Sequence, residues 1–244
     1  MTQHQILSSG SPVYLTIMLG GILLGAFWWS KKFRNDQRLI QIYAFGVVSA
    51  FAGAKIGFLL AESWLYRNDP HFLIYLASGK TVLGALLGGY AGVEFGKWIT
   101  IYRKPTGDWF ASAVPLGIAA GRLGCLAHGC CLGKKCAATW FTITDHAGIS
   151  RWPAPIAELL FNLTAAVIFY LLRRQKILPG QHFHLYLISY GLFRFAHEFV
   201  RDTPPVLGPL SGYHLLALAV TLLGTIGFIK RRNKPVHILE NPAC

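Results

Sequence analysis

The chain has 244 residues, of which 53% are hydrophobic and only 14% are charged, and it contains 23 Lys and Arg against 10 Asp and Glu. A water-soluble domain carries about a quarter charged residues, so this composition excludes an ordinary soluble domain and favours a multi-pass membrane protein. A net charge of +13 suits either nucleic acid or an anionic bilayer surface. The basic residues stand as short clusters between apolar runs, so we expect a lipid surface and no nucleic acid as the partner.

Seven apolar runs follow one another along the chain, and each approaches the ~20 residues that a helix needs to cross hydrocarbon. They predict an all-α integral membrane protein with a single transmembrane domain over residues 1–244. The expected helices lie near residues 12–30, 40–62, 81–101, 109–128, 154–172, 182–200 and 212–229. No Lys or Arg precedes the first run, so we interpret it as a retained helix and not as a signal peptide.

The segments that join these runs predict the orientation in the membrane. Segments after the first, third, fifth and seventh runs hold fourteen Lys and Arg, whereas those after the second, fourth and sixth hold six. Since basic residues accumulate on the cytoplasmic side, we expect the N-terminus outside and the C-terminus in the cytoplasm.

Three basic residues, Lys55, Arg122 and Arg194, lie inside the predicted helices. A charge at mid-bilayer costs about 2.5–3.5 kcal/mol on insertion scales, so it usually faces a cavity or a partner. At ~1.5 Å per residue the three lie roughly 18–24 Å from the inner side, in the outer half of the membrane. We therefore expect them to meet in a cavity for an anionic lipid headgroup, because guanidinium groups bind phosphate in a bidentate manner. The alternative is a structural ion pair.

Further polar residues accompany the sixth run, where Arg194, Glu198 and Arg201 recur at i, i+4 and i+7. This spacing puts them on one helix face, which His197 joins, and it predicts that Glu198 neutralises an arginine.

The third and fifth runs carry two more features. Glycines at every fourth position, Gly84 to Gly96, predict close helix packing in the third run. Pro153 and Pro155 predict the start of the fifth helix. Glu158 near that start has an ordinary explanation in the helix dipole, but it also lies at the level of the buried cations and is a candidate for supporting them.

Four of the five cysteines, Cys125, Cys130, Cys131 and Cys136, follow the fourth run together with His128. Zinc sites usually show two well-separated C-x2–4-C pairs, so the C-x4-C-C-x4-C spacing fits poorly and we expect no metal. A disulfide from Cys136 to Cys130 or Cys131, simple packing at Cys125, and a reactive thiol with His128 as its base all remain open.

Two stretches resemble motifs of a known family. "GRLGCLAHGCCLG" and "YGLFRFAHEFVRDTP" are similar to signatures of the prolipoprotein diacylglyceryl transferases, and weaker similarity covers "AGAKIGFLL", "GALLGG" and "RWPAPIAELL". The resemblance implies a multi-pass enzyme of the bacterial plasma (inner) membrane that uses no cofactor. Such an enzyme moves diacylglyceryl from phosphatidylglycerol to the cysteine thiol of a lipobox-bearing preprotein, and glycerol-1-phosphate leaves.

The resemblance also assigns roles by position. The catalytic candidates that match the motifs directly are Arg122, Arg194 and Glu198. The substrate-binding candidates, some matched and some only neighbouring, are Tyr14, Lys55, Gly121, Gly124, Cys125, Gly129, Cys130, Gly133, Glu158 and Arg201.

Other positions depart from the family pattern. The family histidine that is taken as the base falls at Leu83 or Val82, while Cys125, His128 and Cys130 replace two asparagines and a glutamate. We therefore expect His128 or His197 to act as the catalytic base. The alternatives are a divergent paralogue with another thiol acceptor, a thiol-redox or sulfur-handling protein, and a non-catalytic lipid-binding or transport protein.

Overall fold

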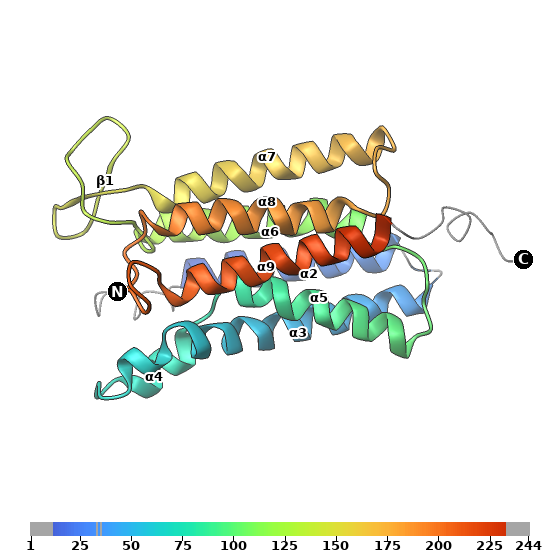
Figure 1. Cartoon of the computed structure of the whole chain (residues 1–244), viewed down its shortest axis with the longest axis horizontal. Coiled ribbons are helices and arrows are strands. Elements are labelled where there is room, and N and C mark those ends of the chain that lie inside the picture. Colours follow the sequence, from blue (N-terminus) through green and yellow to red (C-terminus); the bar gives the residue numbers. More distant parts are fainter. Residues whose placement is uncertain (1–11, 33, 35, 233–244) are drawn as a thin grey trace, which may run out of the picture.

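The computed structural model of the chain describes residues 12–32, 34 and 36–232 (Figure 1). Long helices lie side by side along the longest axis of the molecule (Figure 1). They are α2 (Pro12–Lys32), α3 (Gln37–Ala61), α5 (Val82–Ile99), α6 (Gly107–His128), α7 (Ala154–Arg174), α8 (His182–Glu198) and α9 (Gly212–Arg232). Each predicted apolar run therefore forms a helix, with ends that differ by a few residues from those expected.

Four of the described helices, α3, α6, α7 and α9, are long and apolar enough to cross a membrane. A fifth candidate combines α5 with the short helix α4 (Phe72–Ser78), and the two are bent by 52° at the break between them. Large apolar side chains such as Leu160, Val167 and Leu222 point outward from the bundle, as lipid-facing residues do. The chain is thus a mostly helical, multi-pass membrane protein.

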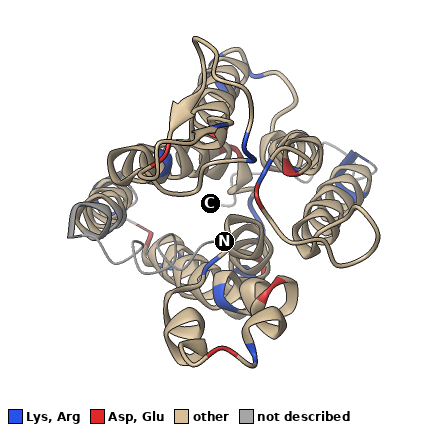
Figure 2. Cartoon of the chain, turned by 90° about the vertical axis from the view of Figure 1, so that its left-hand side faces the viewer, with Lys and Arg blue, Asp and Glu red and all other residues tan. Residues whose placement is uncertain are grey.

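Several small elements escaped the sequence-based prediction, and they lie at the same end of the bundle (Figure 1). Besides α4 they are the single turn η2 (Ser63–Tyr66) and a hairpin of β1 (Ile143–Thr144) and β2 (Ser150–Arg151). The two strands are antiparallel, with Ile143 opposite Arg151. These elements are too short for a periodic signal. Figure 2 shows the bundle from this end, with basic and acidic residues among the helices.

Glycines let α3 and α5 approach closely. A Cβ atom on Gly53 of α3 would lie 2.4 Å from the carbonyl oxygen of Gly84, and one on Gly88 would lie 2.2 Å from the carbonyl oxygen of Ser49. Since real Cβ atoms do not come this near to backbone, only glycine fits at these positions. The prediction that the glycines of the third run serve packing is confirmed.

Helix α8 lies at the centre of the hydrophobic core. Its Tyr186, Leu187 and Tyr190 are fully buried, and they belong to one core cluster with residues of α5, α7 and α9 such as Leu83 and Ala217. At the end of α8 the face that carries Arg194, His197 and Glu198 is buried, whereas Leu192 and Phe199 on the opposite face are exposed.

A buried arginine–glutamate cluster at the hairpin end

Glu158 of α7 is the centre of the polar residues and has no exposed surface. One carboxylate oxygen pairs with Nη2 of Arg122 from α6. The other lies 3.3 Å from Nε of Arg194 in α8 and 3.4 Å from Nη1 of Arg201, which follows α8. A residue that the sequence indicated only as a supporting candidate therefore joins all three arginines. Helix-dipole reasoning could not show this, because it considers one helix at a time.

Glu198, at the end of α8, binds the same arginines from the other side. Its Oε2 lies 2.5 Å from Nη1 of Arg194 and 3.8 Å from Nε of Arg201. Its Oε1 accepts hydrogen bonds from the hydroxyl groups of Thr203 at 2.6 Å and Ser211 at 3.2 Å. The predicted pairing of Glu198 with Arg194 is confirmed.

We call Arg122, Glu158, Arg194, Glu198 and Arg201 the arginine–glutamate cluster. Three guanidinium groups and two carboxylates leave it one net positive charge, and every member is buried. Buried charges are tolerated where each is paired and hydrogen-bonded, and an excess of one is unusual. The cluster is therefore electrostatically suited to one monovalent anion, such as a phosphodiester.

A second set of ion pairs ties the loops together over this end of the bundle. Arg151 in β2 places Nε 2.5 Å from Asp145 and Nη1 2.8 Å from Asp202. The segment after α6 joins them through the backbone, where the amide of Lys134 donates to the carbonyl of Val200 at 2.9 Å. The hairpin, residues 129–136 after α6 (the cysteine segment) and the end of α8 are thus held as one unit.

Titration of the groups in these loops follows from their contacts. The hydrogen bond from Arg151, assisted by two backbone amides, lowers the pKa of Asp145. Burial acts to lower the pKa of Arg201, but Glu158 and Glu198 outweigh it and the net pKa is raised. Arg201 therefore stays charged at every physiological pH.

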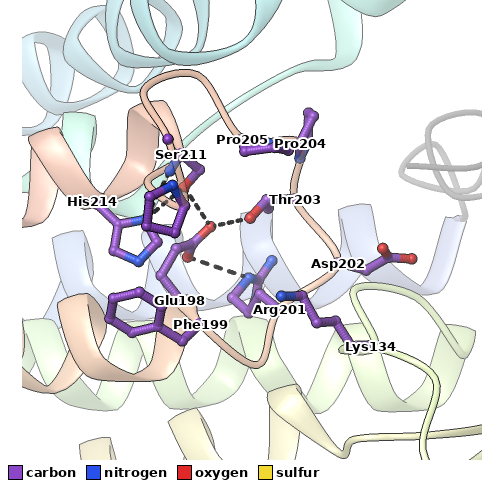
Figure 3. Close-up of a pocket in the computed structure, with 12 residues that line it drawn as sticks. Lys134, Glu198, Phe199, Arg201, Asp202, Thr203, Pro204, Pro205, Ser211 and His214 are labelled. Atoms are coloured by element: carbon purple, nitrogen blue, oxygen red, sulfur yellow. Dashed lines mark hydrogen bonds and ion pairs between the residues drawn. The ribbon is translucent and has the colours of Figure 1, made fainter.

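A cavity of about 510 Å³ lies beside the cluster (Figure 3), within the ~300–1,000 Å³ range of small-molecule sites. Its lining residues include the charged side chains of Glu198, Arg201, Lys134 and Asp202, together with Pro204, Pro205 and His214. Arg122 and Arg194 are not among them. Both guanidinium groups instead pair with buried carboxylates, and their predicted role in binding a lipid headgroup stays a prediction. The cavity meets the cluster through Glu198 and Arg201.

Lys55 does not join the two arginines as expected. Its ammonium donates to the backbone carbonyls of Leu76, at 2.8 Å, and of Ala77, at the end of α4. The error arose because distance along a helix gives depth in the membrane but not the direction of the side chain. Lys55 caps the bent α4–α5 unit, and its expected contact with lipid stays a prediction.

The two candidate histidines differ in their surroundings. His197 is buried, with Nδ1 3.9 Å from Glu158 and Nε2 accepting from the indole of Trp152 at 3.3 Å. His128 is the last residue of α6 and is partly exposed. Of these two histidines, only His197 contacts the arginine–glutamate cluster.

The signature glycines have distinct structural tasks. Gly121 and Gly124 lie within α6, and Gly129 ends that helix in the left-handed conformation, with φ of 66°. Gly133 donates its amide to the carbonyl of Trp152 at 2.8 Å, and it leaves no space for a Cβ atom beside Val200. Their predicted binding role stays a prediction. The side chain of Tyr14 lies outside the described part of the chain.

The cysteine segment folds back on α6. After the turn at Gly129, Cys131 also adopts a positive φ of 62°. This conformation brings the sulfur atoms of Cys125, Cys130 and Cys131 within 4.8 Å of one another. Cys136 is exposed, and all four thiols are free. The disulfide considered between Cys136 and its neighbours is therefore not formed, and the linear spacing did not reveal the three-thiol cluster.

Asn162, which shares a helix face with Glu158, and Tyr186 form a buried chain of hydrogen bonds that ends at the backbone of Glu158. The side-chain nitrogen Nδ2 of Asn162 donates to the backbone carbonyl of Glu158 at 2.8 Å. The hydroxyl of Tyr186 donates to the side-chain oxygen of Asn162 at 2.8 Å. The four-residue spacing between Glu158 and Asn162 was visible, whereas the tyrosine comes from another helix.

The fold and the site together define a polytopic helical membrane protein with a buried, net-cationic cluster beside a cavity. Residues 7–230 match the family model described as prolipoprotein diacylglyceryl transferase, and the chain belongs to this family.

Curated relatives agree with this assignment. A phosphatidylglycerol–prolipoprotein diacylglyceryl transferase of Methylobacillus flagellatus is 29% identical over 82% of this chain and 80% of its own length. The protein of the same name from Bordetella parapertussis is 31% identical over 75% of this chain and 71% of its own. The one from Clostridium tetani is 26% identical over 92% of both.

Proposed function

We propose that the chain transfers the diacylglyceryl group of phosphatidylglycerol to a cysteine thiol of a lipoprotein precursor. The main support is that a family match over residues 7–230 coincides with a buried cluster in which Arg122, Arg194 and Arg201 meet at Glu158. The relatives named above carry this activity in their names.

The charge of the cluster suits the proposed lipid. Phosphatidylglycerol carries one negative charge on its phosphodiester, and the five charged side chains carry one excess positive charge. The carboxylates hold the guanidinium groups in place before the lipid arrives. As glycerol-1-phosphate leaves, its phosphate gains charge, and guanidinium groups already in position stabilise that charge without reorganising. Arg122 and Arg194 would bind the phosphate, and Glu198 would orient Arg194.

The acceptor thiol must lose its proton during the reaction. Leu83, at the position where the family is expected to hold a histidine, is 1% exposed inside the apolar core and cannot act as a base. His197 lies within reach of Glu158, and a base needs to come within ~3 Å of the thiol or reach it through one water. We assign the base role to His197 or to a group of the cysteine segment.

We further propose that all seven long helices cross the bacterial plasma membrane, with the N-terminus outside. The surplus of Lys and Arg in the segments after the odd-numbered runs supports this orientation. The loops that carry the hairpin and the cavity then lie at the outer leaflet, where a secreted precursor emerges.

The direct test uses the purified full-length protein, phosphatidylglycerol labelled in its headgroup glycerol, and a lipobox peptide. Release of labelled glycerol phosphate and formation of the thioether are measured together. Arg194→Ala should lower the rate by at least about 100-fold, because it removes a guanidinium placed for the developing charge. The matched control is Arg174→Ala, an exposed arginine at the far end of α7, which should retain wild-type activity. Equal rates for the two variants would refute the proposal.

A further inference from the structure

Cys125 in the last turn of α6 and Cys130 and Cys131 in the segment that follows form a three-thiol cluster that has no defined role in the chemistry above. The sulfur atoms of Cys125, Cys130 and Cys131 lie within 4.8 Å of one another. Cys125 and Cys130 are buried, and Cys131 is partly so. Packing alone does not require three thiols to converge on one point.

We propose that these three cysteines bind a Zn²⁺ ion. A tetrahedral zinc with Zn–S bonds of about 2.3 Å holds its sulfur ligands about 3.8 Å apart. The observed separations are at most 4.8 Å, so side-chain shifts of about 1 Å complete the set. Soft thiolate ligands select zinc over Mg²⁺ or Ca²⁺, which prefer oxygen.

The charge around the thiols favours a metal–thiolate group. Zn²⁺ with three thiolates carries one net negative charge. Nη1 of Arg122 lies 3.8 Å from the sulfur of Cys125, so the guanidinium stabilises that charge at close range. Binding releases the thiol protons to solvent, because metal-bound sulfur is deprotonated.

Three protein ligands leave the fourth tetrahedral position for a ligand from outside, which is the arrangement of catalytic zinc sites. This part of the inference rests on the proposed transferase function. The acceptor cysteine binds there as a thiolate and its proton leaves to solvent. Its sulfur then forms a bond to the glycerol carbon of the lipid, the carbon–oxygen bond to phosphate breaks, and glycerol-1-phosphate departs with the electron pair. The zinc site would thus supply the thiol activation that Leu83 cannot.

The first experiment measures metal binding without any activity assay. Full-length protein in detergent is reduced, stripped with a chelator, loaded with Zn²⁺ and dialysed, and its metal content is determined by mass spectrometry. We expect about one Zn²⁺ per chain, and Co²⁺ loading should give a thiolate-to-metal charge-transfer band. The double variant Cys130→Ser/Cys131→Ser should lose the band and weaken binding at least about 100-fold. The control Cys136→Ser, which changes an exposed thiol outside the cluster, should bind as the wild type does.

The wild type and Cys136→Ser decide the outcome even if the double variant folds poorly. Any of three results would overturn the proposed metal site. They are the absence of zinc from the dialysed wild type, full zinc binding by the double variant, and a disulfide among the three thiols that persists after mild reduction.

The fourth position is tested on the Co²⁺-loaded protein with a lipobox peptide and with the same peptide carrying serine in place of cysteine. A fourth thiolate should raise the charge-transfer intensity by about one third, and only the cysteine peptide should do so. An unchanged spectrum would refute acceptor binding at the metal.

The failures of the two proposals are distinguishable. A protein that retains zinc but releases no glycerol phosphate contradicts the transferase and not the metal site. An active protein that retains no zinc contradicts the metal site alone.

Discussion

Replacing Glu158 by glutamine removes the charge on which the arginine–glutamate cluster converges while keeping the shape of the side chain. In the wild type three guanidinium groups face two carboxylates, so Glu158→Gln raises the buried excess from one positive charge to two. The residue has no exposed surface, and water cannot compensate the loss. Breaking a buried ion pair by removing one partner costs about 3–5 kcal/mol.

The size of this effect can be checked by thermal unfolding in detergent, followed by tryptophan fluorescence. For a chain of this size 1 kcal/mol corresponds to roughly 2–4 °C, so the midpoint should fall by about 6–20 °C. The matched control is Glu94→Gln, since Glu94 forms an ion pair of 2.9 Å with Lys97 on a half-exposed surface. That pair is worth about 0.2–0.5 kcal/mol. If Glu158→Gln and Glu94→Gln unfold at the same temperature, the structural role given to Glu158 is wrong.

Three further changes test the packing and the loops. Gly53→Ala should destabilise the protein by about 1–3 kcal/mol, because its Cβ would lie 2.4 Å from a backbone oxygen of α5. The control Gly117→Ala, whose Cβ would meet nothing within 4 Å, should be neutral or stabilising. Chemical denaturation measures both free energies of unfolding. Tyr186→Phe, which leaves the buried side-chain oxygen of Asn162 without its 2.8 Å hydrogen bond, should cost about 1–3 kcal/mol in the same assay. Arg151 lowers the pKa of Asp145 below its ordinary value of 3.8. The ion pair therefore stabilises the hairpin fully above pH 3.8, and this stabilisation is lost as the pH falls through the lowered pKa. Amide hydrogen exchange in residues 143–151, corrected for intrinsic rates, should then be faster in acid than at neutral pH for the wild type. The Asp145→Asn variant should exchange fast both in acid and at neutral pH.

The helices were predictable because runs of about twenty apolar residues have few other structures open to them in lipid. Local contacts were predictable for a similar reason. Glu198 and Arg194 are four residues apart on one helix, and they pair as expected. The glycine spacing in α5 also indicated packing correctly.

Contacts between helices were harder to predict, since they depend on which faces meet. Glu158 acquires its importance only when α6 and α8 both pack beside α7, and Lys55 donates to backbone carbonyls of α4 instead of joining the arginines. The three-thiol cluster was hidden because two positive-φ residues, Gly129 and Cys131, reverse the chain within a few residues. Sequence spacing does not report such a reversal.

The dependence of Arg122 on Glu158 has a consequence for how the protein enters the membrane during synthesis. Helix α6 emerges before α7, so its arginine meets lipid without its carboxylate, at a cost of about 2.5–3.5 kcal/mol on insertion scales. Insertion of α6 and α7 as a pair, joined through residues 129–153, would avoid this cost. The charged residues of α8 would then find Glu158 already in place. We therefore expect a truncated chain that ends before α7 to be retained poorly by the bilayer.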